Sequence, residues 1–454
     1  MTRRHGTVVF LCLFLATALC GQDVRTRADE YFTHLAKLQR FSGTVLLAKD
    51  GQILLSKGYG MANHEWDIPN APQTKFRLGS ITKQFTAMAI MQLEERGLLK
   101  VDDPVTKYVP DYPKATGDKI TIHHLLTHTS GIPNFTSFPE YQKTMMSPSP
   151  AEKTLERFKD KPLDFTPGEK FNYSNSGYVL LGLIVEKVSG KPYDTFLQEN
   201  IFGPLGMKNT GYERWDVVLK NRASGYDLSP RGLVNSAYLD MTIPGGAGAL
   251  YSTVEDLYLW DQALYTEKLV KNATMERIVK SWITAGPMGS YGYGWAVNTV
   301  ANHKIVAHGG GINGFQTLIA RFPEERGTFI FLRNVLRPGG PNLQRDMTAL
   351  LFGEKVELFQ EKVAVKVDPK IYDAYVGRYE LRPGFVFTVT RDGDRLMTQA
   401  TGQPQAEIRP LSETRFFAVG PDAELSFGKN EKGEVDKLIL HQGGRDQPAK
   451  RLPN

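Results

Sequence analysis

The chain has 454 residues, 41% of them hydrophobic, so it can bury a large core and is expected to form more than one domain. Its formal net charge of +6 is small for this length. Lysines and arginines are scattered among acidic residues with no basic stripe, which argues against nucleic acid as a partner.

The first 21 residues have the pattern of a secretory signal peptide. Basic residues precede an apolar core, residues 8–15, which is too short to span a bilayer. Both cysteines, Cys12 and Cys20, lie in this segment, so the mature chain is expected to contain no disulfide. Residues 17–19 match a lipidation site at Cys20 poorly, which favours an exported periplasmic or extracellular protein over a lipoprotein. No later segment approaches the ~20 apolar residues of a membrane-spanning helix.

A first domain is expected over residues 22–353, with strands at both ends and helices between them. A hairpin is expected over 43–60, because two apolar runs flank the strong turn signal Asp50-Gly51. Residues 98–290 show helical patterns broken by Pro and Gly. Further strands and a last helix are expected at residues 293–300, 304–308, 315–321, 328–333 and 342–352. This order predicts an α+β fold in which a helical lobe is inserted into a sheet, with the active site between them.

The residue pattern of the sequence changes after the last predicted helix. Residues 354–366 are charged and are interpreted as a linker. From 367 to 454, short β-like runs alternate with turns, which predicts a separate small all-β barrel or sandwich.

The most informative stretch is Ser80-x-x-Lys83, at the predicted start of a helix that Gly97 ends. Positions i and i+3 share a helix face, so the lysine can reach the serine hydroxyl, which is a poor nucleophile without a base. Free N–H groups at the helix start would stabilise an oxyanion, and burial there would favour a neutral lysine. The same pattern recurs at Ser426 and Lys429 in a β-like, Gly-rich context, and we interpret that copy as coincidental.

A second motif is Tyr173-Ser174-Asn175, which is the only Tyr-x-Asn in the chain. A tyrosine hydroxyl beside a lysine can shuttle a proton, and an amide side chain can orient a substrate carbonyl. The structural alternative is that the tyrosine is packed and the asparagine caps a following helix.

A third motif is His308, which is followed on a strand-like run by glycines that include Gly310 and Gly311. Glycines on a strand let a ligand approach the backbone closely, and an N–H group there could complete an oxyanion hole with that of Ser80. The same His-x-Gly spacing recurs at His441, and a strand-edge histidine beside a glycine bulge is the structural alternative.

In this order and context, the three motifs resemble those of the penicillin-recognising serine hydrolases, which include class C β-lactamases, D,D-carboxypeptidases, D-aminopeptidases and esterases. The resemblance spans residues 42–352, and the stretches 125–131, 204–207 and 246–253 are typical of the class C-like branch. It implies an antiparallel sheet flanked by helices, plus a helical lobe. The C-terminal region resembles the lipocalin-like β-barrel of some relatives.

The resemblance implies a role for each motif. Ser80 would attack a carbonyl and form an acyl-enzyme, while Lys83 and Tyr173 would share the general-base and general-acid work. Asn175 would position a small-molecule or peptide substrate, and the N–H groups of Ser80 and Gly311 would form the oxyanion hole. No cofactor or metal is implied, and the sequence does not indicate an oligomeric state.

One departure from the pattern concerns the bond that is cleaved. Class C β-lactamases usually have Lys-Thr-Gly where this chain has His308-Gly309-Gly310. A histidine is mostly neutral near pH 7, so it attracts a substrate carboxylate less than a lysine does. The departure favours a D-amino-acid peptide or a small ester over a β-lactam as substrate.

Three other functions fit the sequence less well. An α/β-hydrolase is disfavoured because no Gly-x-Ser-x-Gly is present. A zinc enzyme built on His123, His124 and His128 is disfavoured because no His-Glu-x-x-His exists, and the resemblance assigns these histidines to a structural loop. A non-catalytic protein with the same fold could bind cell-wall peptides or β-lactams, but it would not need all of the reactive side chains.

Overall fold

The structure, a computed structural model, describes residues 23–453 apart from 230–231, 338, 421–422 and 443–444. The predicted signal peptide, with both cysteines, lies outside the described residues. None of the helices in the described part of the chain is both long and apolar enough to span a membrane.

The chain divides into two compact units, which are Met1–Leu336 with Gln344–Val356 and Arg337–Leu343 with Glu357–Asn454. The first unit is called the N-terminal domain below and the second the C-terminal domain.

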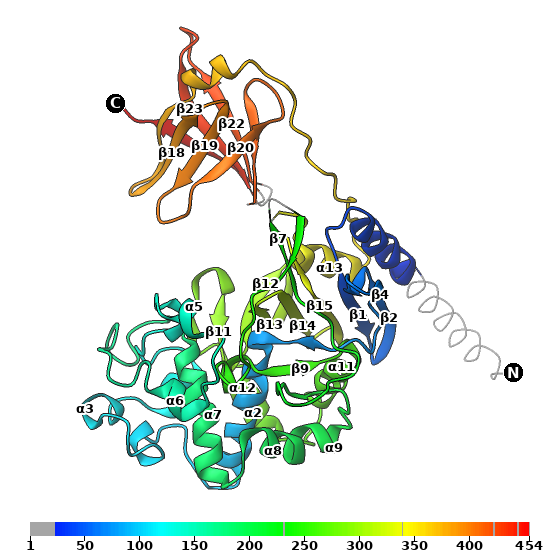
Figure 1. Ribbon diagram of the computed structural model, residues 1–454, viewed down its shortest axis with the longest axis vertical. Helices are drawn as coiled ribbons and strands as arrows, with labels where there is room; N and C mark the ends of the chain where they lie inside the picture. Colours follow the sequence, from blue (N-terminus) through cyan, green and yellow to red (C-terminus); the bar gives the residue numbers. More distant parts are fainter. Residues whose placement is uncertain (1–22, 230–231, 338, 421–422, 443–444, 454) are drawn as a thin grey trace, which may run out of the picture. The chain divides into compact units, whose positions relative to one another are not determined.

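The N-terminal domain is built on an antiparallel eight-stranded sheet (Figure 1). In spatial order its strands are β10 (Ile283–Thr284), β11 (Ser290–Tyr291), β12 (Ala296–Val300), β13 (His303–Ile312), β14 (Phe315–Phe322), β15 (Gly327–Arg333), β1 (Gly43–Lys49) and β2 (Gln52–Tyr59).

The sheet joins the two ends of the domain, as the sequence predicted. β1 pairs with β15 from Gly43↔Arg333 to Lys49↔Gly327. β1 and β2 form the predicted hairpin, and its turn has positive φ angles at Asp50 (51°) and Gly51 (76°). Asp-Gly suits this turn because both central positions of a type I′ turn need positive φ.

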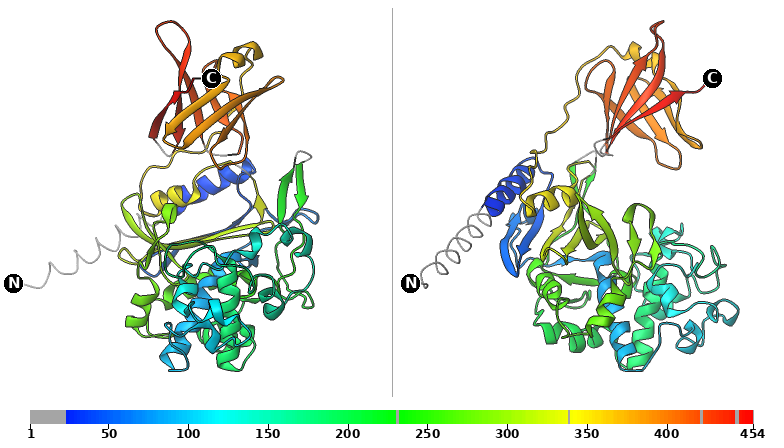
Figure 2. Two further views of the ribbon diagram at one scale, coloured as in Figure 1. Left: turned by 90° about the vertical axis from the view of Figure 1, so that its left-hand side faces the viewer. Right: turned by 180° about the vertical axis from the view of Figure 1, so that it is seen from behind.

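Helices cover both faces of the sheet. Figures 1 and 2 show the helix at residues 23–37 side by side with α13 (Leu343–Leu351) on one face, and α2 (Thr82–Glu95) with α7 (Asn175–Ser189) on the other. The Tyr31 hydroxyl donates to Asp346 Oδ2 at 2.7 Å and joins the first two helices. The sequence predicted α13 and α2, but not the helix at residues 23–37.

In the segment between β2 and β10, most of the regular secondary structure is helical, as the sequence predicted for residues 98–290. Its remaining helices are α3 (Lys114–Gly117), α4 (Ile122–Leu126), α5 (Tyr141–Thr144), α6 (Ala151–Leu155), α8 (Tyr193–Leu197), α9 (Gly203–Leu205), α10 (Gly245–Gly248), α11 (Val254–Ala263) and α12 (Asn272–Ile278). Its short strands, which the sequence did not predict, are β3 (Met61–Asn63), β4 (Ile68–Pro69), β5 (Phe76–Arg77), β6 (Gly211–Tyr212), β7 (Tyr226–Ser229), β8 (Gly232–Asn235) and β9 (Leu250–Ser252).

The C-terminal domain is a closed barrel, which confirms the prediction of a small all-β domain. Its strands are β17 (Gly377–Arg382), β18 (Phe385–Asp392), β19 (Arg395–Ala400), β20 (Ala406–Pro410), β21 (Arg415–Ala418), β22 (Glu424–Lys429), β23 (Val435–Gln442) and β24 (Arg445–Arg451). Side chains alternate along the strands, so that Leu425, Phe427, Leu438 and Leu440 are buried in one core.

Candidate active site

Ser80 lies in a short 3₁₀ turn, η1 (Gly79–Ile81), which leads directly into α2. Gly79 has a φ of 55°, a conformation that glycine adopts without strain. The turn leaves Ser80 partly exposed, whereas Ile81 is fully buried. The predicted helix start is therefore confirmed, and it presents the hydroxyl at the surface of a buried helix.

Lys83 points back from α2 to this hydroxyl. Its side chain is 0% exposed, and Nζ lies 2.9 Å from Ser80 Oγ. The same nitrogen lies 2.8 Å from Asn175 Oδ1 and 2.9 Å from the carbonyl oxygen of Ala247 in α10. None of these partners carries a charge. Complete burial without a counter-charge lowers the pKa of Lys83 well below its ordinary value.

Asn175 is the first residue of α7, but its side chain does not cap that helix. Oδ1 accepts from Lys83, and Nδ2 donates to Thr136 Oγ1 at 3.2 Å. The backbone N–H of Asn175 donates to Asn134 Oδ1 at 3.1 Å. The capping alternative is therefore wrong, and the amide faces the lysine.

Tyr173 places its ring beside the same lysine, with 4.9 Å between Lys83 Nζ and the ring centroid. Burial raises the pKa of Tyr173, and an interaction with the Ser80 hydroxyl opposes this effect. The phenol is thus protonated near neutral pH and lies close to the serine.

His308 lies on β13 and is bonded through both ring nitrogens. Nε2 lies 2.8 Å from the Tyr291 hydroxyl, and Nδ1 lies 2.6 Å from the carbonyl oxygen of Gly309. Because a carbonyl can only accept, Nδ1 carries the proton and Nε2 accepts from the tyrosine. Burial, with the nearby Lys83 as a smaller cause, lowers the pKa of His308 to about 3. The histidine is therefore neutral at physiological pH.

The two predicted glycines differ in their surroundings. A Cβ at Gly310 would clash with the carbonyl oxygen of Leu78, so this glycine lets β13 pack against the segment before Ser80. Thr317 on β14 donates to the same carbonyl oxygen at 2.7 Å. Gly311 is exposed, and a Cβ there would meet nothing within 4 Å. Only Gly311 borders open space.

The structure adds His128, which the sequence analysis assigned to a structural loop. Its ring is 2% exposed and lies 4.2 Å from the Tyr173 ring, centroid to centroid. Nδ1 accepts from the backbone N–H of Ser174 at 3.1 Å. Burial lowers the pKa of His128 well below its ordinary value, and Lys83 and His308 lower it further. The ring therefore supports the Tyr173–Asn175 loop while remaining neutral.

The feature that marks His128 is its backbone conformation. His128 has a φ of 57°, which is uncommon outside glycine, and such positions cluster at functional sites. No local pattern in the sequence predicts this angle.

The three histidines of the zinc alternative have separate partners. His123 Nδ1 lies 2.8 Å from the Tyr293 hydroxyl, and His124 forms a capping box with Thr121 at the start of α4. Across the residues that the structure describes, no group of three or more His, Cys, Asp or Glu side chains is placed to hold a metal ion.

The site as a whole places a partly exposed hydroxyl beside the buried Lys83 amine, with the buried rings of His128 and His308 nearby. Lys83, His128 and His308 all have lowered pKa values, and each is lowered chiefly by burial. A neutral amine next to a hydroxyl can accept its proton, which is the requirement for nucleophilic attack by serine.

Two family models match this chain in succession. One described as Beta-lactamase matches residues 28–354, and one described as a domain of unknown function (DUF3471) matches residues 361–451. Penicillin-binding protein 4* of Bacillus subtilis (strain 168) is 32% identical over 453 residues, which cover 95% of this chain and 99% of that protein.

Solved structures share the fold as well. The octameric penicillin-binding protein homologue from Pyrococcus abyssi has a TM-score of 0.67 and 30% identity, and the match covers 94% of this chain and 99% of that one. A D-stereospecific amidohydrolase from Streptomyces sp. has a TM-score of 0.62 and 25% identity, with 74% and 99% coverage.

Proposed function

The chain belongs to the β-lactamase family, and from this premise we propose that it is a serine hydrolase that cleaves amide or ester bonds through an acyl-enzyme. The observation that carries the proposal is the contact of 2.9 Å between the buried Lys83 amine and the partly exposed Ser80 hydroxyl. A hydroxyl in this position has both a base beneath it and access to a substrate.

The contacts of Lys83 fit a neutral amine. Two N–H groups are available to the carbonyl oxygens of Asn175 and Ala247, at 2.8 and 2.9 Å. The nitrogen lone pair is then left for the Ser80 hydroxyl. During attack on a carbonyl carbon, the Ser80 proton passes to Lys83 Nζ as the Oγ–C bond forms. The C–N or C–O bond of the substrate then breaks, and the leaving group takes up a proton.

Tyr173 is the other group that can exchange protons at the reaction centre. Its raised pKa keeps the phenol protonated, which suits proton donation to the leaving group. In this proposal Lys83 and Tyr173 share the acid and base work. The backbone N–H groups of Ser80 and Gly311 stabilise the oxyanion.

The proposed substrates are amides and peptides of D-amino acids and small esters rather than β-lactams. His308 is neutral and both of its ring nitrogens are bonded within the protein, so it offers a substrate carboxylate little attraction. The likeness to a D-stereospecific amidohydrolase supports the D-amino-acid class.

The experiment that tests this proposal compares specificity constants. We expect kcat/KM to be higher for D-amino-acid amides or short-chain esters than for a chromogenic cephalosporin. A preference for the cephalosporin by orders of magnitude would assign the protein to the β-lactamases proper. If no substrate turns over and a fluorescent phosphonate fails to label the protein, the non-catalytic binding protein is the correct alternative.

We also propose that the protein is exported, on the basis of the signal-like pattern in residues 1–21. The measurement is the intact mass of the protein recovered outside the cytoplasm. A mass that includes all of these residues would contradict cleavage of a signal peptide.

A further inference from the structure

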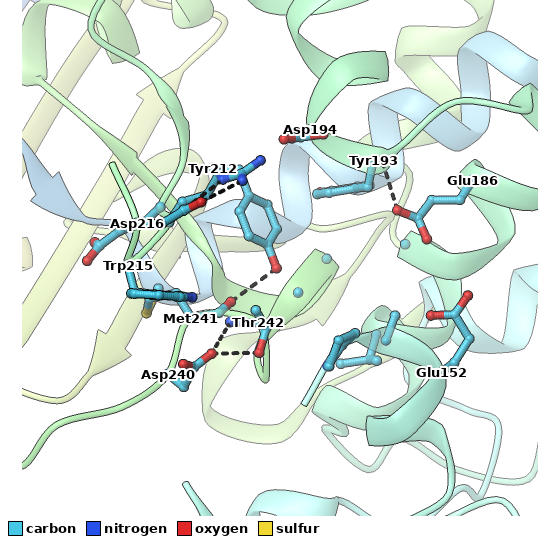
Figure 3. Close-up of a pocket in the computed structure, with 18 residues that line it drawn as sticks. Glu152, Glu186, Tyr193, Asp194, Tyr212, Trp215, Asp216, Asp240, Met241 and Thr242 are labelled. Carbon is cyan, nitrogen blue, oxygen red and sulfur yellow. Dashed lines mark hydrogen bonds and ion pairs between the residues drawn. The ribbon is translucent and has the colours of Figure 1, made fainter. Parts of the chain in front are cut away.

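The N-terminal domain contains a cavity with a volume of about 300 Å³ (Figure 3). Ser80, Lys83 and Tyr173 are not among the residues that line it. Its size is at the lower end of the roughly 300–1,000 Å³ typical of ligand pockets, so it suits a small ligand. Its wall includes Gly246, which precedes the residue whose carbonyl binds Lys83.

Aromatic side chains form part of the wall. Tyr212, Trp215 and Tyr193 are among the lining residues in Figure 3. The Tyr212 hydroxyl donates to the carbonyl oxygen of Met241 at 3.1 Å, which fixes its ring. Trp215 is 75% exposed, so part of the wall is open to solvent. Faces of tyrosine and tryptophan attract cations through their quadrupoles.

Acidic side chains also line the cavity, together with Arg214 and Thr242, and some of the acidic side chains form ion pairs. These pairs are Glu213 with Arg77 at 2.8 Å, Asp216 with Arg214 at 2.9 Å and Glu152 with Lys187 at 3.4 Å.

Three other carboxylates of the lining, Glu186, Asp194 and Asp240, have no ion pair within the described part of the chain. Glu186 Oε1 accepts the backbone N–H of Tyr193 at 2.9 Å. Asp240, which is 2% exposed, accepts the Thr242 hydroxyl at 2.6 Å. These bonds hold the carboxylates in place without neutralising their charge.

Neighbouring carboxylates contribute to the raised pKa values of two residues that line the cavity. Burial raises the pKa of Glu186, and the charges of Glu152 and Asp194 raise it further, while Lys187 lowers it. Burial also raises the pKa of Tyr212, and Glu186, Asp194 and Asp240 add to that effect. A positive charge in the cavity would relieve this repulsion.

We propose that this cavity binds a small organic ammonium ion, with its charge facing the unpaired carboxylates and its apolar body against Tyr212 and Trp215. A bare metal ion fits less well, because no group of metal-ligating side chains is assembled among the residues described. The proposal goes beyond hydrolysis at Ser80. The ligand is defined by its cationic nitrogen and apolar body.

Calorimetric titration of the full-length protein tests the proposal. The probes are phenethylammonium, 2-phenylethanol and phenylacetate at matched ionic strength, which share a ring and differ in charge. We expect the ammonium to bind about tenfold more tightly than the alcohol, in keeping with a partly desolvated cation–aromatic and carboxylate contact. Equal affinities for ammonium and alcohol would overturn the proposal.

Two variants locate the site. Glu186→Gln and Trp215→Ala are each expected to weaken ammonium binding about threefold or more. Trp215 is so exposed that its removal leaves the fold intact. The matched controls are Glu276→Gln, at an exposed position outside the cavity, and Trp66→Ala, at a residue that is 78% exposed. Both controls should bind normally. If Glu186→Gln and Trp215→Ala bind as tightly as the unaltered protein, the ammonium lies elsewhere and the proposal fails.

Discussion

The chain contains Ser-x-x-Lys twice, and the two copies lie in different secondary structure with different side-chain contacts. At the start of α2, Lys83 Nζ lies 2.9 Å from Ser80 Oγ, because side chains three positions apart share a helix face. Ser426 and Lys429 lie instead on β22, where side chains three positions apart do not share a face. Lys429 is exposed, whereas Lys83 is fully buried. The same pattern therefore brings a buried amine to a serine hydroxyl only on the helix.

Ser426 nevertheless has another partner. Its Oγ lies 2.7 Å from His441 Nε2, and His441 Nδ1 lies 2.6 Å from Asp446 Oδ1, the order of a Ser-His-Asp triad. However, the Asp446 side chain is 74% exposed, and β22 is hydrogen-bonded to β21 and β23 on its two sides. Its backbone N–H groups are therefore used in the ladder rather than available to an oxyanion. A bonded hydroxyl needs a buried base and free backbone donors before it becomes a catalytic site.

The strongest test of this contrast removes each serine in turn. Ser80→Ala is expected to abolish turnover and labelling by a fluorescent phosphonate, because Ser80 contacts Lys83, the only fully buried lysine among the residues that the structure describes. Ser426→Ala is expected to leave both unchanged. The measurement is labelling stoichiometry, with circular dichroism to confirm the fold. Full labelling of Ser80→Ala would contradict the assignment of Ser80 as the nucleophile and would make Ser426 the next candidate.

Replacing each of the two lysines should affect the labelling rate almost as differently as replacing each of the two serines. Lys83→Met keeps the volume and burial but removes the base, so the labelling rate should fall by roughly 10²–10⁴-fold. Lys429→Met is the matched control and should have no effect. In the unaltered protein the base must be deprotonated, so the labelling rate should rise with pH. Burial lowers the pKa of Lys83, so the labelling rate should reach its plateau at a pH well below 10.5, the ordinary pKa of a lysine. A rate that still rises near pH 10 would contradict a neutral lysine.

The sequence identified the residues that carry local signals. Ser80 and Lys83 have the spacing of residues that share a helix face. Tyr173 and Asn175 belong to the only Tyr-x-Asn motif of the chain, so all four could be found without a structure. Whether Asn175 caps α7 or faces Lys83 could not be decided, because its contact at 2.8 Å depends on how two helices pack. Similarly, the partners of Ser426 depend on the registers of β22, β23 and β24, which no local pattern specifies.

His128 was missed for the same reason, and its role in positioning Tyr173 can be tested. His128→Phe keeps an aromatic ring against Tyr173 but leaves the Ser174 N–H without an acceptor. Displacement of the Tyr173–Asn175 loop should lower kcat by roughly 10–100-fold with little change in KM. His441→Phe, at the barrel histidine that contacts Ser426, is the control and should not change the kinetics. An unaltered kcat in His128→Phe would show that the imidazole only fills space.

A smaller effect, on substrate preference, is expected when His308 is replaced. His308→Lys would restore the residue usual in class C β-lactamases and add a positive charge near the substrate. A unit charge ~4 Å away is worth about 4 kcal/mol at intermediate dielectric, before desolvation costs. If a third of this is realised, the cephalosporin-to-ester ratio of specificity constants should rise about tenfold. The loss of the Tyr291 and Gly309 contacts lowers both rates, so the ratio is the informative quantity. An unchanged ratio would mean that position 308 does not select the substrate.

The smallest effect is expected from removing the barrel altogether, together with Ser426. We propose that residues 354–366 are a linker, since none of them lies in a helix or strand. Trypsin should cleave there, for example at Lys355. A chain that ends at Val356 keeps the carbonyl groups of Gly353 and Glu354, which accept from Arg27. Because every residue of the Ser80 site lies in the N-terminal domain, this shortened chain should label within about twofold of the full-length rate, as expected for independently folding domains. Unfolding of the shortened chain would show that the N-terminal domain depends on the barrel for its stability.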